Sequence, residues 1–398
     1  MDFAPTPKVK ALEERLRDFM DRHVHPSERT YYEQIEASGN RHHRPKVLED
    51  LKAQAKTAGL WNLFLPDPRH GPGLTNLEYA PLAGIMGRVL WAPEVFNCAA
   101  PDTGNMEILA QFGTDEQKAR WLTPLLEGSI RSGFSMTEPM TPGSDPTQLK
   151  VRAVREGDAW VINGRKWFTT GGMHARVLLV MAVTSPEAPR LRRASLILVP
   201  KDTPGVTVVR STPVLGHVSS SGECEIAYEN VRVPASHLLG AEGEGFAVAQ
   251  ARLGPGRIHH CMRAVGMADR AIEIMCRRAA TRIVAGGALA ERQMVQDMIA
   301  TSRIEVEAAR FLVLNAAWKM DTAGKRAAWP EISMAKVLCA QMACAVLDRA
   351  IQVHGALGVT DDVPLAAMYR YARILRIGDG ADEVHKAKIA EHETRRWR

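Results

Sequence analysis

The chain has 398 residues, of which 45% are hydrophobic and 24% charged, and 51 Lys and Arg against 45 Asp and Glu give a net charge of +6. These values are ordinary for a globular protein and exclude a disordered or collagen-like chain. The longest clean apolar run, Val177–Val183, is far shorter than the ~20 residues of a membrane span, and neither terminus resembles a targeting signal, so we expect a cytoplasmic protein of the bacterial type.

Three composition zones divide the chain, and we expect each to form a domain. Residues 1–130 predict an N-terminal helical domain, residues 131–240 a middle β domain and residues 241–398 a C-terminal helical domain. In the first zone, residues 43–60 carry apolar side chains at helical spacing and end near a glycine. Residues 114–126 predict a second helix, because Thr114 and Gln117 have the spacing of a capping box.

The middle zone changes to a strand pattern. Residues 151–155 and 160–168 are rich in β-branched and aromatic side chains on either side of Glu156-Gly157-Asp158, which predicts a hairpin. Strand-length segments follow at 177–184, 195–200, 206–210 and 223–233, between turns rich in Pro and Gly. Regular strands without intervening helices predict an antiparallel barrel or sandwich.

The last zone is helical to its end. Ala, Leu, Ile and Met recur at helical spacing in residues 261–280, 289–322, 330–353 and 381–396. Long helices joined by short turns predict an antiparallel bundle of four helices. The expected fold class is therefore α+β, in the order helical, β, helical.

Several common site motifs are missing from the sequence. It contains no G-x-G-x-x-G, no P-loop and no G-x-S-x-G, which argues against the usual nucleotide sites and the usual esterase. The histidine pairs lack the spacing of a zinc helix, so no metal is expected, and His259 and His260 are interpreted as lining or packing a helix. The six cysteines form no C-x-x-C pair and are expected to be free thiols.

The positive charge allows two interpretations. A basic excess can indicate a nucleic-acid partner, but +6 over 398 residues is small. Lys and Arg are also mixed with acidic residues along the predicted helices. A solvated helix face is therefore favoured over nucleic-acid binding.

Two loops contain glycine together with chemically useful side chains. The first runs from Phe-Ser-Met-Thr-Glu-Pro at 134–139 to Gly143-Ser144-Asp145. Its amides and hydroxyls suit a flat polar cofactor with phosphates, or form a turn-rich linker. In the second, residues 377–384, Asp379 lies between two glycines, where a carboxylate can approach a substrate closely. A simple loop in which Asp382 caps the last helix is the alternative.

Taken together and in this order, these features resemble the acyl-CoA dehydrogenase family over essentially the whole chain. The resemblance implies the acyl-CoA dehydrogenase fold, an α+β arrangement of an N-terminal helical domain, a middle antiparallel β-barrel or sandwich and a C-terminal four-helix bundle. Segments 92–98, 101–107 and 253–260 are most similar to the dehydrogenase part of members ten and eleven. The matching motifs are GTDEQK at 113–118, PLLEG at 124–128, MTEP at 136–139, INGRKW at 162–167, NVRVP at 230–234, QVHG at 352–355 and the Asp379 loop.

The resemblance implies FAD as the cofactor and assigns its site position by position. Thr137 would donate to the edge of the isoalloxazine ring, and Arg282 would reach the FAD of a neighbouring subunit. Ala285 and Ala356 stand where the family usually has an aromatic residue and a glycine. The implied FAD-binding residues are Phe134, Ser135, Met136, Thr137, Gly143, Ser144, Trp167, Phe168, Thr169, Arg282, Gln293, Gln352, Ala356, Asp382, Glu383 and Val384.

The resemblance also places Asp379 at the catalytic base, where most of the family has glutamate. Gly256, at the position of an alternative base in some members, offers no carboxylate. Aspartate is one methylene shorter, so the loop or the substrate must come closer, because a general base needs a reach of about 2.6–3.2 Å. Arg257 matches an arginine beneath the base, and Ser144, Arg257 and Gly380 are the implied substrate-binding residues.

The implied reaction is α,β-dehydrogenation of a fatty or branched acyl-CoA to the trans-2-enoyl-CoA. Asp379 would take the α-proton, the β-hydride would pass to FAD, and an electron-transfer flavoprotein would take the electrons. The partners would be acyl-CoA, that flavoprotein and other copies of the chain in a dimer or tetramer, without nucleic acid or a membrane span. Two alternatives stay open. A flavin oxidase of the same fold is one, because nitroalkane oxidation in the superfamily uses an aspartate base. The other is the DNA-associated alkylation-response branch, which the pI of 9.0 suggests.

Overall fold

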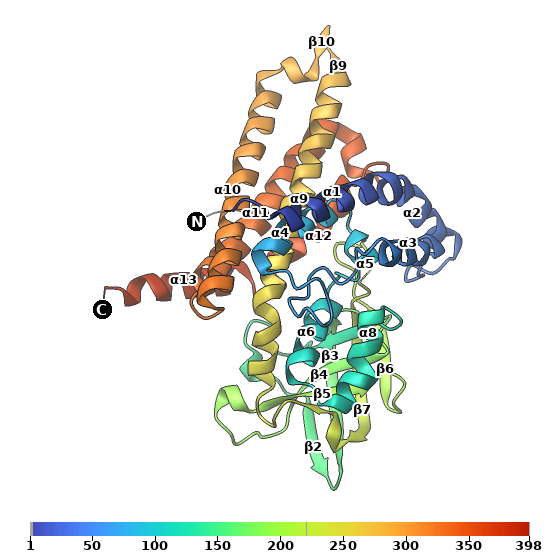
Figure 1. Cartoon of the computed structure of the whole chain (residues 1–398), viewed down its shortest axis with the longest axis vertical. Helices are drawn as coiled ribbons and strands as arrows, with labels where there is room; N and C mark the ends of the chain where they lie inside the picture. Colours follow the sequence, from blue (N-terminus) through green and yellow to red (C-terminus); the bar gives the residue numbers. More distant parts are fainter. Residues whose placement is uncertain (1–2, 220, 398) are drawn as a thin grey trace. The chain divides into compact units, whose positions relative to one another are not determined.

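The computed structural model describes residues 3–219 and 221–397, which cluster into two compact units. The first unit comprises Met1–Arg29, Ala53–Val95 and Arg257–Arg398, and the second comprises Thr30–Lys52 and Phe96–Gly256. Along the chain, helices come before and after the strands (Figure 1), so the predicted order is confirmed.

The two ends of the chain are helical as predicted, but several helices were not predicted individually, among them α1, α2, α4 and α5. α9 begins at Gly245 rather than near residue 261 and continues through Gly254-Pro255-Gly256, and α12 was not predicted. The helices are α1 (Pro7–Phe19), α2 (Glu28–Ala37), α3 (Lys46–Thr57), α4 (Asn76–Gly87), α5 (Ala92–Val95), α9 (Gly245–Thr281), α10 (Gln293–Ala323), α11 (Trp329–His354), α12 (Leu365–Leu375) and α13 (Asp382–Arg395).

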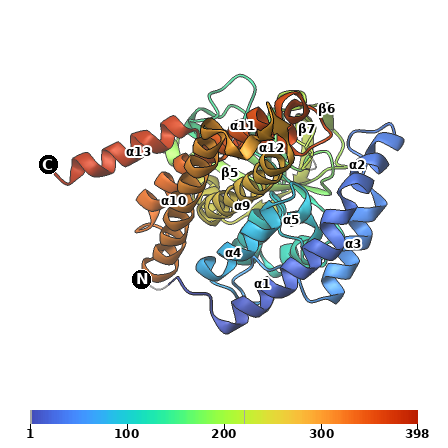
Figure 2. The same ribbon diagram turned by 90° about the horizontal axis from the view of Figure 1, so that it is seen from above.

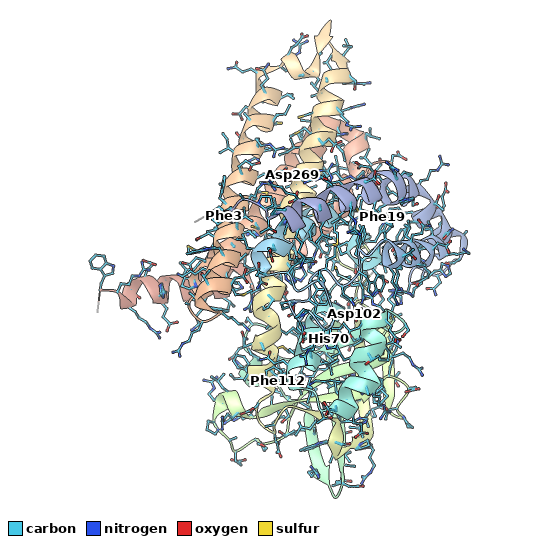
Figure 3. The ribbon with its side chains drawn as sticks, viewed as in Figure 1. Phe3, Phe19, His70, Asp102, Phe112 and Asp269 are labelled. Carbon is cyan, nitrogen blue, oxygen red and sulfur yellow. The ribbon has the colours of Figure 1, made fainter. Side chains whose placement is uncertain are left out.

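The C-terminal helices of the first unit pack against one another. The short strands β9 (Ile283–Val284) and β10 (Gly287–Ala288) form the hairpin that joins α9 to α10. Along these two helices, Asp269 accepts from Arg303 at 2.9 Å and from Arg310 at 2.7 Å (Asp269 is labelled in Figure 3). Seen from above, α10, α9 and α11 are neighbours (Figure 2). Among the described residues, the stretch 329–359 is long and apolar enough to span a membrane, but over half of its most apolar window is buried, as in a core helix.

Glycine allows α4 and α9 to cross closely within this unit. A Cβ placed on Gly266 would lie 1.8 Å from the backbone oxygen of Gly84. A Cβ on Gly84 would instead have the oxygen of Met262, at 3.7 Å, as its nearest neighbour, which is an ordinary contact. The close approach of the two backbones therefore requires glycine at position 266 but not at position 84.

We expect Gly266→Ala to destabilise the protein by about 1–3 kcal/mol or more, because the new methyl group must push two packed helices apart. The matched control is Gly84→Ala, which places the same methyl group at the same crossing without a clash. It is expected to change stability by less than about 1 kcal/mol, with helix propensity in its favour. Urea unfolding of both variants measures the difference, and equal losses would contradict the prediction.

The second unit is built on one eight-stranded sheet in the order β6-β7-β3-β2-β4-β5-β8, with β1 paired to β4. Most pairings are antiparallel, and β4 pairs in parallel with β1 and with one residue of β2. The predicted hairpin is confirmed, with Glu156 opposite Ala159. The strands are β1 (Ser132–Ser135), β2 (Arg152–Glu156), β3 (Ala159–Thr169), β4 (Val177–Val183), β5 (Ala194–Pro200), β6 (Val206–Ser211), β7 (Cys224–Pro234) and β8 (Leu238–Leu239).

Three short helices of this unit, α6 (Asp102–Phe112), α7 (Asp115–Gln117) and α8 (Thr123–Glu127), precede the sheet. The predicted capping box at Thr114 and Gln117 is confirmed by reciprocal bonds of 3.2 Å. A buried ion pair then ties α6 to β1, because Asp102 (labelled in Figure 3) accepts from Arg131 and, at 2.7 Å, from the Ser132 amide. This attachment fixes the start of the loop that was predicted to bind the cofactor.

Candidate active site

The loop that follows β1 is fastened to β3 by backbone and side-chain bonds. Thr137 donates through Oγ1 to the Trp167 oxygen at 2.7 Å, and its own carbonyl accepts from the Trp167 amide at 3.0 Å. A Cβ on Gly143 would lie 3.3 Å from the Thr137 methyl carbon, so the loop folds back onto itself there. Thr137, Gly143 and Trp167, all predicted site residues, are thus brought together within the second unit.

A buried ion pair holds the next residue of the loop. Glu138 is 3% exposed and Lys166 is fully buried, and their side chains meet at 2.9 Å. Lys166 Nζ also donates to the Met136 oxygen at 2.7 Å. Glu138 accepts in addition from the amides of Lys150, at 2.8 Å, and Val151, at 2.9 Å. The pair is therefore the internal clamp of the loop, and burial lowers the pKa of Lys166 to about 8.

Two aromatic side chains lie beside this loop at a bulge in β3. Register shifts between Lys166 and Thr169, and Phe168 has a φ of 48° although it is not glycine. Its ring is 39% exposed and lies edge to face with Trp167, with centroids 5.1 Å apart. A bulky residue in the left-handed region carries a backbone cost, which is found at functional sites. The exposed ring and the fastened loop fit the flat ring of a flavin.

Other predicted flavin residues are buried in the same unit. The Ser135 hydroxyl lies 3.0 Å from Thr169 Oγ1 and 2.9 Å from the Tyr228 hydroxyl, so these side chains are used internally. Phe134 is buried beneath Arg252, whose guanidinium carbon lies 4.1 Å from the ring centroid. Met136 is half-buried and Ser144 is exposed. Ser135 and Thr169 are fully buried, so they support the loop from inside the unit and present no side chain to a ligand.

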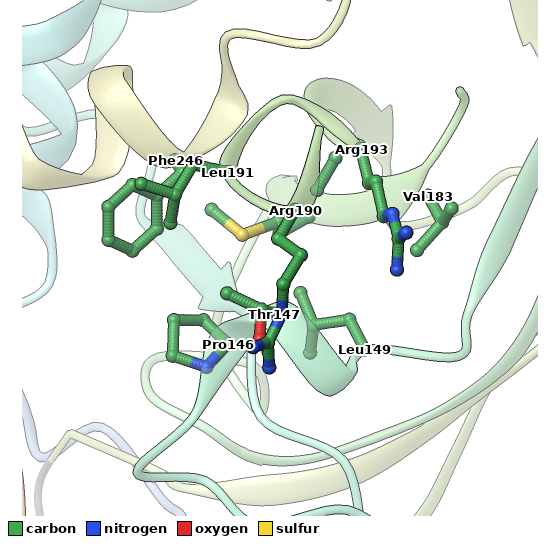
Figure 4. A pocket seen from close by; sticks show the side chains of 10 residues that line it. Pro146, Thr147, Leu149, Val183, Arg190, Leu191, Arg193 and Phe246 are labelled. Atoms are coloured by element: carbon green, nitrogen blue, oxygen red, sulfur yellow. The ribbon is translucent and has the colours of Figure 1, made fainter. Parts of the chain in front are cut away.

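A small cavity lies next to the end of the loop (Figure 4), among Pro146, Thr147, Leu149, Arg190 and Phe246. Arg190 reaches across it and donates to Thr147 Oγ1 at 3.0 Å. Its volume of about 10 Å³ is close to the room that one water needs. This cavity is too small for an organic ligand.

In the first unit, the loop between α12 and α13 presents Asp379. Three side chains hold this loop through backbone carbonyl oxygens. Arg257 donates to the Asp379 oxygen at 2.9 Å, and His385 Nε2 lies 3.3 Å from the same oxygen. Lys336 donates to the Gly380 oxygen at 3.3 Å and to the oxygen of Leu375, at the end of α12. Asp379 has a φ of 55° and Gly380 a φ of 101°. A Cβ on Gly380 would lie 2.8 Å from His385 Nε2, so glycine is required there.

The carboxylate of Asp379 is 26% exposed and has a histidine beside it. His260 Nε2, on α9, lies 3.2 Å from Asp379 Oδ2. The neighbouring His259 instead packs against Tyr79, with ring centroids 4.7 Å apart. Both histidines lie on α9, as expected for residues that line or pack a helix, and His260 in addition contacts the predicted base.

Arg257 lies beneath the loop as the resemblance implied, but its bond is to the backbone of Asp379. The guanidinium carbon also lies 5.0 Å from the centre of the Trp329 ring, and burial lowers its pKa. Arg257 therefore supports the position of the loop more directly than it acts on the carboxylate.

The residues at the start of α13 differ in exposure. The Asp382 carboxylate is buried and accepts from Arg376 at 2.9 Å and from Gln341 at 3.0 Å, so it belongs to the interior. The helix cap is Ala381, and the alternative in which Asp382 caps the helix is wrong. Glu383 is exposed and Val384 half-buried.

Four predicted flavin residues lie on exposed parts of the first unit. Arg282 follows α9 and accepts through its carbonyl from the Leu289 amide at 2.8 Å, across the hairpin. Gln293 begins α10, and Gln352 and Ala356 lie at the end of α11 and just after it. All four are solvent-exposed in the single chain. Within the described residues, no group of three His, Cys, Asp or Glu is placed to hold a metal.

Three family models together match most of the chain. Family models described as the N-terminal, middle and C-terminal domains of acyl-CoA dehydrogenase match residues 6–129, 133–231 and 243–394. The chain belongs to the acyl-CoA dehydrogenase family. It is accordingly an oxidoreductase acting on the CH–CH group of donors, in a family of flavoproteins of fatty acid metabolism.

Individual relatives show how far this similarity extends. The chain is 53% identical to the Mycobacterium tuberculosis protein named Probable acyl-CoA dehydrogenase FadE2, over 100% of the chain and 98% of that protein. It is 48% identical to mouse acyl-CoA dehydrogenase family member 10 over 98% of the chain, but it spans only 37% of that protein. A solved structure of a candidate acyl-CoA dehydrogenase from Mycobacterium abscessus is 47% identical, with a TM-score of 0.96 over 99% of the chain and 100% of that structure.

Stability of this acyl-CoA dehydrogenase should depend on pH through His385. Burial, and then the positive charges of Arg257 and Lys336, lower its pKa from 6.5 to about 4. Between about pH 4 and 6.5 the unfolded chain binds this proton more readily, so stability is lost as the pH falls through that window. We expect the Tm to fall from pH 6.5 to 4, and to fall less steeply in His385→Gln. Thermal melts across this range test it, and identical slopes for both proteins would contradict it.

Apart from Arg257, sequence reasoning missed the residues that hold the base loop and its carboxylate. Lys336, His385 and His260 carry no motif of their own, and the first lies over 40 residues from the loop. One signal was available: Arg257 and His260 are three residues apart, and such residues share a helix face. Once Arg257 was placed beneath the base, His260 could have been placed beside it.

Proposed function

We propose that this chain is an FAD-dependent acyl-CoA dehydrogenase that converts a fatty or branched acyl-CoA to its trans-2-enoyl-CoA. The observation that carries the proposal is the position of Asp379. Its carboxylate is partly exposed, while its loop is held by Arg257, Lys336 and His385 through backbone oxygens. A general base must be fixed and still reach the proton that it takes.

In this proposal Asp379 removes the α-proton of the thioester and keeps it on a carboxylate oxygen. FAD, when bound, supplies the acceptor for the β-hydride, so the substrate loses one proton and one hydride and gains a double bond. Thr137, Gly143, Trp167 and Phe168 would hold and cover the flavin ring. The clamp of Glu138 and Lys166 would keep this surface in place.

The predicted flavin residues that are exposed in the first unit suggest that the active protein is a homo-oligomer. The family resemblance gives Arg282, Gln352 and Ala356 to the FAD of a neighbouring subunit, and their exposure leaves them accessible to one. We therefore include a homo-oligomer, a dimer or tetramer, in the proposal. An electron-transfer flavoprotein is the proposed acceptor of the electrons.

Anaerobic bleaching of the bound flavin tests the proposal. The purified protein is mixed with short, medium, long and branched acyl-CoAs, and we expect at least one to remove the oxidised flavin absorbance and yield the enoyl-CoA. No bleaching by any member of the panel would overturn it. Reoxidation then separates the alternatives, because rapid reaction with oxygen alone would indicate the oxidase that an aspartate base also suits.

A further inference from the structure

His260 lies between the proposed base, Asp379, and a cation on its own helix, Arg263. Its Nε2 is 3.2 Å from Asp379 Oδ2, and its Nδ1 is 3.0 Å from Arg263 Nη2. Arg263 is itself 7% exposed, and a Cβ on Gly87 of α4 would lie 2.5 Å from its Cα, so its backbone is closely packed. Arg263, His260 and Asp379 form a row of three bonded side chains in the first unit.

The chemistry of arginine determines the direction of these bonds. A guanidinium has only donors, so Arg263 donates and His260 Nδ1 accepts. The proton of a neutral imidazole is then on Nε2, and this N–H points at the Asp379 carboxylate. His260 therefore donates to Asp379 and cannot take a proton from it through that nitrogen.

The surroundings keep this imidazole neutral. Burial lowers the pKa of His260, and Arg263 and Lys336 act in the same direction, whereas Asp379 opposes them. The other titratable groups close by are His259 on α9, whose pKa is also lowered by burial, and Arg257 and His385 against the loop of Asp379. His260 is therefore a neutral imidazole whose Nε2–H donates to the Asp379 carboxylate.

We propose that His260, oriented by Arg263, is a positioning residue that sets the orientation of the Asp379 carboxylate for proton abstraction. Asp379 is short, and the three loop contacts described above act on its backbone or on its neighbours rather than on its carboxylate. The His260 contact with Oδ2 is made to the carboxylate itself and restrains its rotation. This proposal rests on the proposed function, in which Asp379 is the base.

The kinetic test compares His260→Leu with His260→Gln. Leucine fills the space without a donor, whereas the glutamine amide can donate from nearly the same place. We expect His260→Leu to lower kcat about 10²-fold, the scale of a misplaced reacting group, with KM little changed. The acid limb of the kcat/KM profile should move to higher pH, because the carboxylate anion loses a donor. His260→Gln should recover most of kcat and the wild-type profile.

His259→Gln is the matched control, because it removes the adjacent histidine of the same helix. It should lower the Tm through its lost contact with Tyr79 and leave the pH profile in place. Wild-type kcat and profile in His260→Leu would overturn the proposal, as would a failure of His260→Gln to recover activity while its Tm is normal.

A spectroscopic measurement separates this inference from the proposed function. In protein labelled with nitrogen-15 at histidine, the resonances of His260 are assigned by their loss in His260→Gln. We expect the Nε2–H tautomer of His260, and we expect this imidazole to stay neutral as the pH falls below 6.5. An Nδ1–H tautomer, or protonation of His260 at the usual histidine pKa of about 6.5, would overturn the inference even if acyl-CoAs bleach the flavin. If no acyl-CoA does, the function fails, and the tautomer still decides the contact.

Discussion

Asp379→Asn is expected to abolish flavin bleaching by acyl-CoA, with a loss of at least 10²–10⁴-fold, roughly the contribution of a positioned general base. An amide cannot take the α-proton. Asparagine is otherwise a close match for this position, because it tolerates the left-handed backbone of residue 379 and its oxygen can accept from His260 Nε2. The variant should therefore fold and retain FAD.

Rapid mixing without oxygen measures the effect, with flavin absorbance as the signal. A normal Tm and a normal flavin content of Asp379→Asn are the controls that attribute the loss to the chemical step. Bleaching by the variant at the wild-type rate would remove Asp379 as the base, although it would leave the family assignment intact.

Lys166→Met is expected to destabilise the protein by about 3–5 kcal/mol, because it leaves the buried Glu138 carboxylate without its cation. The loop from residue 134 to 144 loses its clamp at the same time, so FAD retention should fall. The double variant Lys166→Met with Glu138→Gln removes both charges and should recover part of the loss. Thermal and urea unfolding measure stability, and gel filtration followed by flavin absorbance measures retention.

The reverse single variant, Glu138→Gln, should cost less, because a lysine can lose its proton. The pKa of Lys166 is already lowered to about 8, and without Glu138 it should fall further. The folded protein then holds this proton less tightly than the unfolded chain, so the stability of Glu138→Gln should rise as the pH increases toward 10.5. Equal costs for both single variants at pH 9 would contradict this asymmetry.

Local patterns predicted the elements, and long-range contacts decided the details that they missed. The capping box at Thr114 and the hairpin at Gly157 depend on neighbouring residues, so both were visible in the sequence. The start of α9 was misplaced because Gly254-Pro255-Gly256 is a typical helix breaker, whereas tertiary packing can override propensity. α12 was missed, although its Leu365, Met368 and Ala372 are buried at helical spacing.

The site was predicted in the same uneven way. Asp379 and Gly380 were found because a carboxylate between glycines before a helix is recognisable, and the family resemblance gave it a role. Of the donors that hold the loop, the family resemblance also placed Arg257, 122 residues from Asp379, beneath the base, whereas Lys336, 44 residues from Gly380, could not be found from the sequence. The bulge that turns Phe168 outward depends on register shifts between β3 and β7, which no local pattern encodes.

The way in which the loop at residue 379 is fastened has a consequence for how such an enzyme changes over time. Arg257 and Lys336 donate to main-chain oxygens, which every amino acid possesses, so exchanging Asp379 for a residue that tolerates the left-handed backbone leaves those attachments unchanged. The chemistry at position 379 can therefore change by a single substitution, while the residues that hold the loop stay the same. His260 is the exception, since its partner is a side-chain atom, and a lineage that lengthens or removes the carboxylate would be expected to replace His260 as well.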